Sequence, residues 1–509
     1  MENIRSRLKF GNKEEDVKLR TRKSQLYCFL CSTGVLGLRV ALLTVAFRLI
    51  NCFLVQTSFV PDEYWQSLEV SHHMVFKYPS TLLSTGIRGF SYPLLFAIIY
   101  KILQCMNYDS IYLLIWLPRV IQALLAAFAD VKFFYLMRTL ENHDIAKWTF
   151  FCHLSSWFTW FCCTRTLTNS METTITSLAL FYYPLPGSKT QSRYLTLVAL
   201  AVIVRPTALI VWFPLILYHF WQEDDKLRLI THRYIPIGFV VSFNSRRVVF
   251  PQWTMVQFNF LKFNIIHGVA DFYGSHPWHW YFTQGFMVVI GPHLPFFLHG
   301  CTLALKKYKS CWWLLSGHLL PHKEFRFIYP VLPFCMVFCG ISLASLKAWQ
   351  QAAAFLLLVS NLFPALYTGL VHQRGTLDVM NHIQTLCDVN SSSITTQPDV
   401  LFLMPCHSTP YYSHIHCPIK MRFLECRPDL GQEDYVDEAD IFYRDPLLWL
   451  RTLFPYKSSL PTHLLLFDVL EQEISVFLQG NKYVRTAEIF HTHFPEGRVG
   501  GSIFIYERH

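Results

Sequence analysis

Charged residues are scarce in this chain. They make up 15% of its 509 residues, whereas a soluble globular protein has about a quarter. Hydrophobic residues account for 52%, and apolar runs recur through the first two thirds of the sequence. The low charge and the repeated apolar runs argue against an ordinary soluble enzyme and predict a protein embedded in a membrane.

Signatures of metal-binding modules are missing as well. No repeated Cys-x-x-Cys pattern suggests a zinc module, and most of the fifteen cysteines lie in apolar runs, where cysteine acts as a small hydrophobic residue. Cys406, Cys417 and Cys426 lie in polar sequence instead, and we expect one disulfide among them in an oxidising compartment. The histidines at positions 407, 414 and 416 fit no zinc spacing, so we expect no metal there.

Basic residues gather at the amino terminus. Residues 1–24 contain eight lysines and arginines against four acids. Such a patch is compatible with nucleic-acid binding, but an apolar segment from Leu26 to Val55 follows directly, and positive charge beside a span marks the cytoplasmic side. The segment is too long for the core of a signal peptide and lacks an obvious cleavage site, so we interpret it as an uncleaved first span. We expect no nucleic-acid partner.

The pattern of apolar segments predicts a mainly helical protein of three parts. Residues 1–24 form a cytoplasmic basic tail, residues 25–371 a multi-pass transmembrane domain with residues 56–91 as its first lumenal loop, and residues 372–509 a soluble domain, also expected in the lumen. We expect roughly eight to eleven membrane elements, some of them re-entrant. After the first span, the apolar segments are 92–106, 111–138, 148–163, 173–184, 195–221, 281–303, 327–346 and 352–371.

The composition changes after His372, where proline, serine, histidine and acids become frequent. Short apolar runs at 400–404, 463–467 and 502–506 predict strands, so this part is expected to be a mixed α/β domain. Asn390 begins a glycosylation sequon, which has meaning only if the domain is lumenal.

An acidic segment opens the first predicted loop. A proline precedes Asp62 and Glu63, and proline followed by acids is a favourable start for a helix. At about 100° per residue, Asp62, Gln66, Glu69 and His73 fall on one face, and apolar residues fall on the other. The segment predicts a helix lying on the membrane surface with its carboxylates exposed. Taken alone, the two acids could equally well only complement the helix dipole.

Several blocks of sequence together carry a resemblance to a known family. In order, they are Phe59–Gln66, Ser84–Pro93, Arg165–Glu172, Arg205–Thr207, Tyr273–Tyr281, His322–Phe327 and His491–Arg498. These blocks resemble the membrane mannosyltransferases of glycosyltransferase family 22, which have the GT-C fold and use dolichyl-phosphate mannose. The acidic block and the His-Lys-Glu-x-Arg-Phe block are typical of the family, and the carboxy-terminal blocks resemble the members that build the glycosylphosphatidylinositol anchor.

The resemblance implies a polytopic GT-C enzyme of the endoplasmic reticulum membrane with lumenal loop helices. It would transfer the third mannose, α-1,2-linked, from dolichyl-phosphate mannose to a dimannosyl glycosylphosphatidylinositol precursor. A lipid phosphate leaves as a stable anion, so the transfer needs one base and phosphate-binding cations but no general acid. Residues 56–91 contain no Asp-x-Asp metal site, and we expect no metal or other cofactor. We predict Asp62 as the base, with Glu63 as the alternate base or an orienting group.

Two arginines are candidates for holding the donor. Arg88 is predicted at the membrane face, where it would bind the phosphate; the alternative is an interfacial anchor. Arg205 lies inside an apolar run, where a charge is costly unless it is paired or faces water. It therefore either lines the donor pocket or pairs with an acid such as Asp130 or Glu172. Pro206 predicts a break in the helix at this point.

Two further blocks contain candidate substrate contacts. A dense charged cluster at residues 322–326 precedes an apolar run and could bind phosphate. Aromatic and imidazole side chains mix in the block before residue 281, which suits sugar binding, although the position before a span favours an interfacial aromatic belt. The candidate substrate-binding residues are Gln66, Arg88, Arg205, His276, Trp278, His279, His322, Lys323 and Arg326.

Two rival functions remain at this point. One is a mannosyltransferase of the same family that acts on the dolichol-linked oligosaccharide. The other is a secondary transporter, with Arg119, Asp130 and Arg205 as intramembrane sites. Arg119 and Asp130 share one helix face but lie about 16 Å apart along the axis, so they cannot pair with each other. The acidic loop outside the bilayer and the large soluble domain favour the enzyme.

Overall fold

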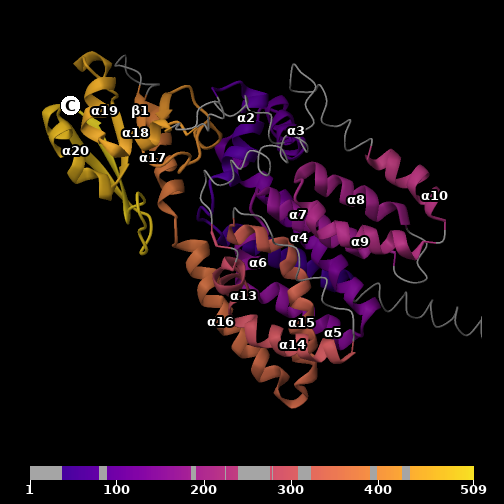
Figure 1. The fold of residues 1–509 in the computed structure, drawn as a ribbon. Coiled ribbons are helices and arrows are strands. Elements are labelled where there is room, and N and C mark those ends of the chain that lie inside the picture. The colour runs from indigo at the N-terminus through magenta and orange to yellow at the C-terminus, as the bar shows by residue number, and fades with distance from the viewer. Residues whose placement is uncertain are drawn as a thin grey trace, which may run out of the picture.

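Helices dominate the structure, a computed structural model that describes residues 37–79, 89–184, 191–223, 225–238, 276–277, 279–307, 323–389, 398–426 and 436–509 (Figure 1). Within these ranges, three shorter apolar helices accompany five helices that are long and apolar enough to cross a membrane. These five are Gly37–Leu54, Ile111–Leu140, Tyr281–Leu305, Phe325–Ser345 and Lys347–Cys387. The chain is a multi-pass membrane protein.

The predicted apolar segments correspond to helices of one bundle. The break predicted at Pro206 is confirmed, because α8 ends at Val204 and α9 begins at Ala208. After the first helix, the bundle elements are α3 (Ser91–Cys105), α4 (Ile111–Leu140), α5 (His143–Ser155), α6 (Trp157–Cys162), α7 (Thr168–Phe181), α8 (Gln191–Val204), α9 (Ala208–Gln222), α10 (Lys226–Leu229), η3 (Ile230–Tyr234), η6 (Tyr281–Gly285), α13 (Phe286–Ile290), η7 (Gly291–His293), α14 (Leu294–Lys307), η9 (Phe325–Val331), α15 (Leu332–Ser345), η10 (Lys347–Trp349) and α16 (Gln350–Leu370).

The bundle contains buried charges that have partners inside the protein. On α4, Asp130 accepts a hydrogen bond of 2.7 Å from Nε of Arg48 and lies 2.9 Å from Nε2 of His153. Arg119, also on α4, donates to two carbonyl oxygens at the end of the first helix. As predicted, Arg119 and Asp130 face the bundle interior without pairing with each other. Buried charges are tolerated when they are paired and hydrogen-bonded, so these groups need no transported substrate to explain them.

A five-stranded sheet forms the centre of the carboxy-terminal domain, in the order β2-β1-β3-β5-β4. β1 pairs in parallel with β2 and β3, and β5 is antiparallel to β3 and β4. The three predicted strands and the mixed α/β class are confirmed. The elements are α17 (Gly375–Val389), β1 (Asp399–Leu403), η11 (Tyr412–His414), β2 (Lys420–Phe423), α18 (Glu438–Arg444), α19 (Pro446–Leu453), η12 (Lys457–Ser459), β3 (His463–Phe467), α20 (Asp468–Gly480), β4 (Tyr483–Phe490) and β5 (Ser502–Arg508).

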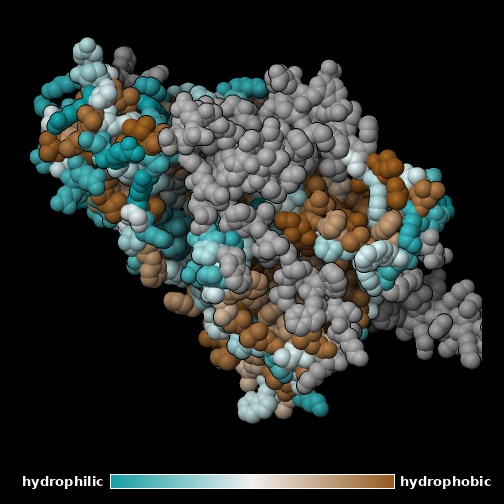
Figure 2. Space-filling model, in the orientation of Figure 1, coloured by the Kyte–Doolittle hydropathy of each residue, from teal (hydrophilic) through white to brown (hydrophobic). Residues whose placement is uncertain are grey.

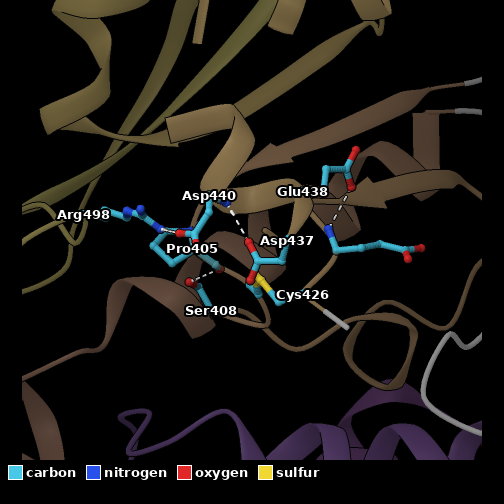
Figure 3. Close-up of a disulfide and its surroundings, with 9 residues drawn as sticks. Pro405, Ser408, Cys426, Asp437, Glu438, Asp440 and Arg498 are labelled. Atoms are coloured by element: carbon cyan, nitrogen blue, oxygen red, sulfur yellow. Dashed lines mark hydrogen bonds and ion pairs between the residues drawn. A yellow bond between two sulfur atoms is a disulfide. The ribbon is translucent and has the colours of Figure 1, made fainter. Parts of the chain in front are cut away.

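Two disulfides hold the β1–β2 connection, Cys406 to Cys426 and Cys387 to Cys417. The predicted disulfide among Cys406, Cys417 and Cys426 is confirmed as Cys406–Cys426. The second bridge was not predicted, because Cys417 pairs with Cys387 on α17. Figure 3 shows the first disulfide beside Asp437, whose carboxylate lies within 4.8 Å of both sulfur atoms. The bond between the sulfurs removes the thiolates that a metal would need at this place.

The carboxy-terminal domain packs on the first loop of the bundle. That loop consists of η1 (Tyr64–Leu68), a π-helical turn, and α2 (Glu69–Phe76). Figure 1 shows the domain at one end of the bundle, next to α2, and Figure 2 shows hydrophobic residues over the bundle and mostly hydrophilic residues over the domain. A single hydrophobic core contains side chains of both parts, among them Trp65, Leu68, Met404 and Tyr411. The domain and the acidic loop are therefore positioned together.

Candidate active site

Asp62 lies at the start of the loop helix, where its side chain is a quarter exposed. Its carboxylate accepts a hydrogen bond from the guanidinium of Arg326 on η9. Arg326 donates a second bond of 2.6 Å to Glu324, so two acids hold one nearly buried arginine. An open carboxylate beside a fixed cation is a suitable position for a base that acts on a bound hydroxyl.

Glu63 points away from this opening into the protein. Its side chain is 2% exposed, and it forms an ion pair of 2.8 Å with Arg165, which is fully buried. Arg165 also donates to the carbonyl oxygens of Thr57 and Phe161, and its guanidinium lies 4.2 Å from the centre of the Phe161 ring. Glu63 therefore holds the loop against the connection between α6 and α7, as expected for the orienting group of the two predicted roles. The role of Asp62 as the base stays a prediction.

Two of the predicted cations meet at one aromatic ring. The guanidinium carbons of Arg205 and Arg326 lie 4.7 Å and 5.4 Å from the centre of the Phe327 ring. Of the two acids proposed as partners for Arg205, the structure selects Glu172, at 3.3 Å. The predicted pairing of Arg205 with an acid is confirmed. Because this pair lies beside Phe327, the donor-pocket role of Arg205 stays a prediction.

Lys323 adds a third cation to the same cluster. It is buried, donates a bond of 2.8 Å to the carbonyl oxygen of His276, and lies 5.9 Å from the centre of the Tyr281 ring. The imidazole of His276 stacks on Trp280, with ring centres 4.8 Å apart. His279 is exposed and contacts Thr283 of its own helical turn. The block before residue 281 thus meets the charged block at residues 322–326 through the contact between His276 and Lys323.

Gln66 lies in the π-helical turn Tyr64–Leu68 and is half-buried, and its predicted role stays a prediction. Asn169 on α7 also borders the site, although it was not among the candidate residues predicted from the sequence. Its amide nitrogen donates to the carbonyl oxygen of Arg326, and its buried amide oxygen has no hydrogen-bond partner within the described ranges. Glu324 was also missed as a site residue, although its position two residues before Arg326 in the charged block was a usable signal.

Four of the predicted residues lie outside the part of the chain that the structure describes. They are Arg88, Trp278, His322 and the sequon residue Asn390. Their predicted roles stay predictions.

Glu69 corrects the predicted geometry of the loop helix. Its carboxylate is buried and accepts hydrogen bonds from the backbone nitrogens of Tyr411 and Ser413 and from the Ser413 hydroxyl. The prediction that Glu69 shares an exposed face with Asp62 is wrong for two reasons. The π-helical turn Tyr64–Leu68 changes the angular spacing between the two acids, and the carboxy-terminal domain covers the helix.

The segment 404–419, here named the clamp loop, makes these contacts. The Trp65 indole donates a bond of 2.8 Å to the Thr409 carbonyl oxygen, and its ring lies 4.5 Å from that of His407. Burial lowers the pKa of His407 to about 4, against a smaller opposite effect of the Asp62 carboxylate. The clamp loop therefore approaches the candidate base as well as Glu69.

Burial also makes Glu69 sensitive to pH. It raises the pKa of Glu69 to about 7, although the bonds from Ser413 and Tyr411 act in the opposite direction. A carboxyl whose pKa is raised on folding stabilises the fold at low pH, and this contribution is lost as the pH rises through about 7. We expect Glu69→Gln to be less destabilised than the wild type when the pH is raised from 5 to 8, as measured by thermal unfolding in lipid nanodiscs.

The difference between the wild type and the variant isolates the contribution of Glu69 to the pH dependence of stability from the contributions of neighbouring histidines. Burial lowers the pKa values of His72 and His414 to about 3, so these groups contribute with the opposite sign, losing stability as the pH falls. Identical pH dependence in the wild type and in Glu69→Gln would contradict the assignment to Glu69.

Comparison with known proteins agrees with this geometry. The profile of the Alg9-like mannosyltransferase family matches residues 39–416. The chain is 60% identical to GPI alpha-1,2-mannosyltransferase 3 of Danio rerio, with 100% of this chain and 98% of the relative covered. It is 58% identical to the Homo sapiens protein of the same name, with 97% and 92% covered, and 40% identical to GPI mannosyltransferase 3 of Drosophila melanogaster, with 91% and 85% covered.

Solved structures show the same fold at low identity. ArnT from Cupriavidus metallidurans, in its crystal structure bound to undecaprenyl phosphate, has a TM-score of 0.57 at 11% identity, over 93% of this chain and 98% of that one. The Archaeoglobus fulgidus oligosaccharyltransferase has a TM-score of 0.51 at 11% identity, over 93% and 74%. The predicted GT-C fold is confirmed. Together with the acidic loop and its cation cluster, these findings establish that the chain belongs to the Alg9-like mannosyltransferase family.

Proposed function

We propose that the chain transfers an α-1,2-linked mannose, the third of the anchor, from dolichyl-phosphate mannose to a dimannosyl glycosylphosphatidylinositol precursor. The observation that carries this proposal is full-length identity near 60% to relatives with this named activity, together with the partly exposed Asp62 that pairs with Arg326. The buried, internally paired charges of α4 give no support to a transporter.

In the proposed mechanism, Asp62 takes the proton from the acceptor mannose hydroxyl while the oxygen attacks the anomeric carbon of the donor. The lipid phosphate leaves from the opposite side with the bonding electrons, so a single inversion turns a β-linked donor into an α-linked product. No covalent intermediate is needed. The reaction requires one base, which the exposed carboxylate of Asp62 supplies.

The cation cluster is proposed to hold the departing phosphate. Arg205, Lys323 and Arg326 gather around Phe327 and Tyr281, and fixed cations stabilise charge that develops on a leaving group. Glu324 and Glu172 keep two of the guanidiniums in place. We propose that these groups replace a metal ion in the reaction.

We also propose that the site and the carboxy-terminal domain face the lumen of the endoplasmic reticulum. The disulfides Cys387–Cys417 and Cys406–Cys426 support this side, because disulfides persist in oxidising compartments. Protease added to sealed microsomes should leave residues 372–509 intact, and non-reducing mass spectrometry should find both linkages. Digestion from the cytoplasmic side, or free thiols at these positions, would refute the orientation.

The function is tested in cells that lack surface glycosylphosphatidylinositol-anchored proteins because this transfer is missing. Expression of the chain should restore them, whereas Asp62→Asn should not. Membranes from these cells should move labelled mannose from dolichyl-phosphate mannose to the dimannosyl precursor, and an α-1,2-mannosidase should release it. Label on the dolichol-linked oligosaccharide instead would favour the rival member of the family.

A further inference from the structure

The tail block at residues 491–501 takes no part in the site described above. It connects β4 to β5 and is here named the tail hairpin. It lies against the end of α16, where Nδ1 of His493 is 3.1 Å from the Tyr367 hydroxyl and the Thr492 hydroxyl is 3.0 Å from Nδ1 of His372. Figure 1 shows the connection as a narrow projection of the domain that reaches toward α16. The tail hairpin therefore meets the bundle where a membrane span ends.

Phe494 projects from the tail hairpin with 70% of its surface exposed. The backbone around it is held in place. Its own nitrogen donates to the Thr492 hydroxyl, and Glu496 and Val499 exchange two backbone hydrogen bonds around Gly497, whose φ of +60° suits glycine. A phenyl ring exposed to water lacks the free energy that it would gain by burial, which indicates a partner surface for Phe494.

Arg498 fixes the far side of the tail hairpin to the domain. Its guanidinium donates a bond of 2.7 Å to Asp440 (Figure 3) and lies 4.6 Å from the centre of the Tyr443 ring. The hairpin is thus tied to α18 on one side and to α16 on the other. The hairpin therefore connects the soluble domain to the membrane span.

The exposed surface of α16 is continuous with Phe494. Tyr367 stacks on Phe363 with ring centres 6.2 Å apart, and the Phe494 ring meets Tyr367 at the same separation. Below this point the span exposes a row of large apolar side chains, the surface that a membrane helix turns toward lipid. These residues are Phe355, Leu356, Leu358, Val359, Leu362 and Phe363, exposed by 46 to 75%.

We propose that the tail hairpin is an interfacial anchor, with Phe494 inserted at the boundary between headgroups and acyl chains on the side of the soluble domain. Aromatic residues at the end of a span concentrate at this depth of the bilayer. The position of Phe494 beside Tyr367 continues the lipid-facing row of α16 from the bundle onto the soluble domain. The anchor sets the height of that domain above the membrane. Because the clamp loop of the domain is hydrogen-bonded to Glu69, the anchor also sets the position of the acidic loop.

The test uses the unmodified full-length protein in nanodiscs of phosphatidylcholine that contain a photoactivatable phosphatidylcholine. After irradiation, mass spectrometry should find lipid adducts on the tail hairpin several-fold above those on α20. The α20 peptide is a matched control, because Val476 is 61% exposed on the same domain but belongs to no surface joined to α16. Equal labelling of both peptides would overturn the proposal.

Two variants and one added ligand distinguish an interfacial anchor from an acceptor-binding site or a protein-binding surface. Phe494→Ser should lose most of the adducts on the hairpin and keep those on α16, whereas Phe494→Trp should retain both. Since these nanodiscs contain no glycolipid, adducts that form only after addition of a glycosylphosphatidylinositol precursor would assign the hairpin to acceptor binding and overturn the interfacial role. A crosslink to another protein in place of lipid would overturn it as well.

Discussion

Asp62→Asn should lower the rate of mannose transfer at least ~100-fold while the amount of folded protein stays near that of the wild type. Asparagine keeps the size of the side chain and can still accept a hydrogen bond from Arg326, but it cannot take a proton. Glu324 still pairs with the nearly buried Arg326, so the substitution does not leave that charge without a partner. The measurement is single-turnover transfer of labelled mannose at saturating donor, with protein quantified by size-exclusion chromatography.

The matched control for this variant is Glu324→Gln, which also removes a carboxylate beside Arg326 but leaves the proposed base intact. It should weaken use of the donor more than it lowers the rate at saturating donor, because Glu324 only orients Arg326. If Asp62→Asn transfers mannose at nearly the wild-type rate, the base lies elsewhere and the proposed mechanism fails.

The membrane part of the fold could be predicted because its signals are local. Runs of apolar residues of spanning length correspond to helices in the structure, and Pro206 breaks the helix where the sequence indicated. The strands at 400–404, 463–467 and 502–506 could be predicted equally well, since short apolar runs between turns are typical of strands in a buried sheet.

What could not be predicted depends on contacts between distant segments. Glu69 was expected at the surface, and only the approach of Ser413, 344 residues further along the chain, shows why a carboxylate is buried there. Cys387 lies in a helix, where the sequence indicates only a small apolar residue. Its disulfide with Cys417 depends on the fold, which brings the two cysteines together. The difference between Asp62 and Glu63 likewise has no signal in the sequence, because both are acids at the start of one helix.

Glu63 and Arg165 form a buried ion pair, and we expect its disruption to affect folding. Removing one partner of a buried ion pair costs about 3–5 kcal/mol, because the other charge stays buried without compensation. Glu63→Gln should therefore lower the yield of folded protein and the unfolding temperature, in contrast to Asp62→Asn. The measurement is thermal unfolding in nanodiscs together with the yield of monodisperse protein.

A double variant separates a structural Glu63 from a catalytic one. Glu63→Leu should be more destabilising than Glu63→Leu combined with Arg165→Met, because replacing both charges of a buried pair by apolar groups is often nearly neutral. The recovery will be partial, since Arg165 also bonds the carbonyl oxygens of Thr57 and Phe161. The opposite pattern, in which Glu63→Gln folds with wild-type stability but transfers no mannose, would give Glu63 the role of the base. The ion pair predicts the first pattern because it binds the Glu63 carboxylate to a buried arginine, whereas the side chain of the neighbouring Asp62 is a quarter exposed.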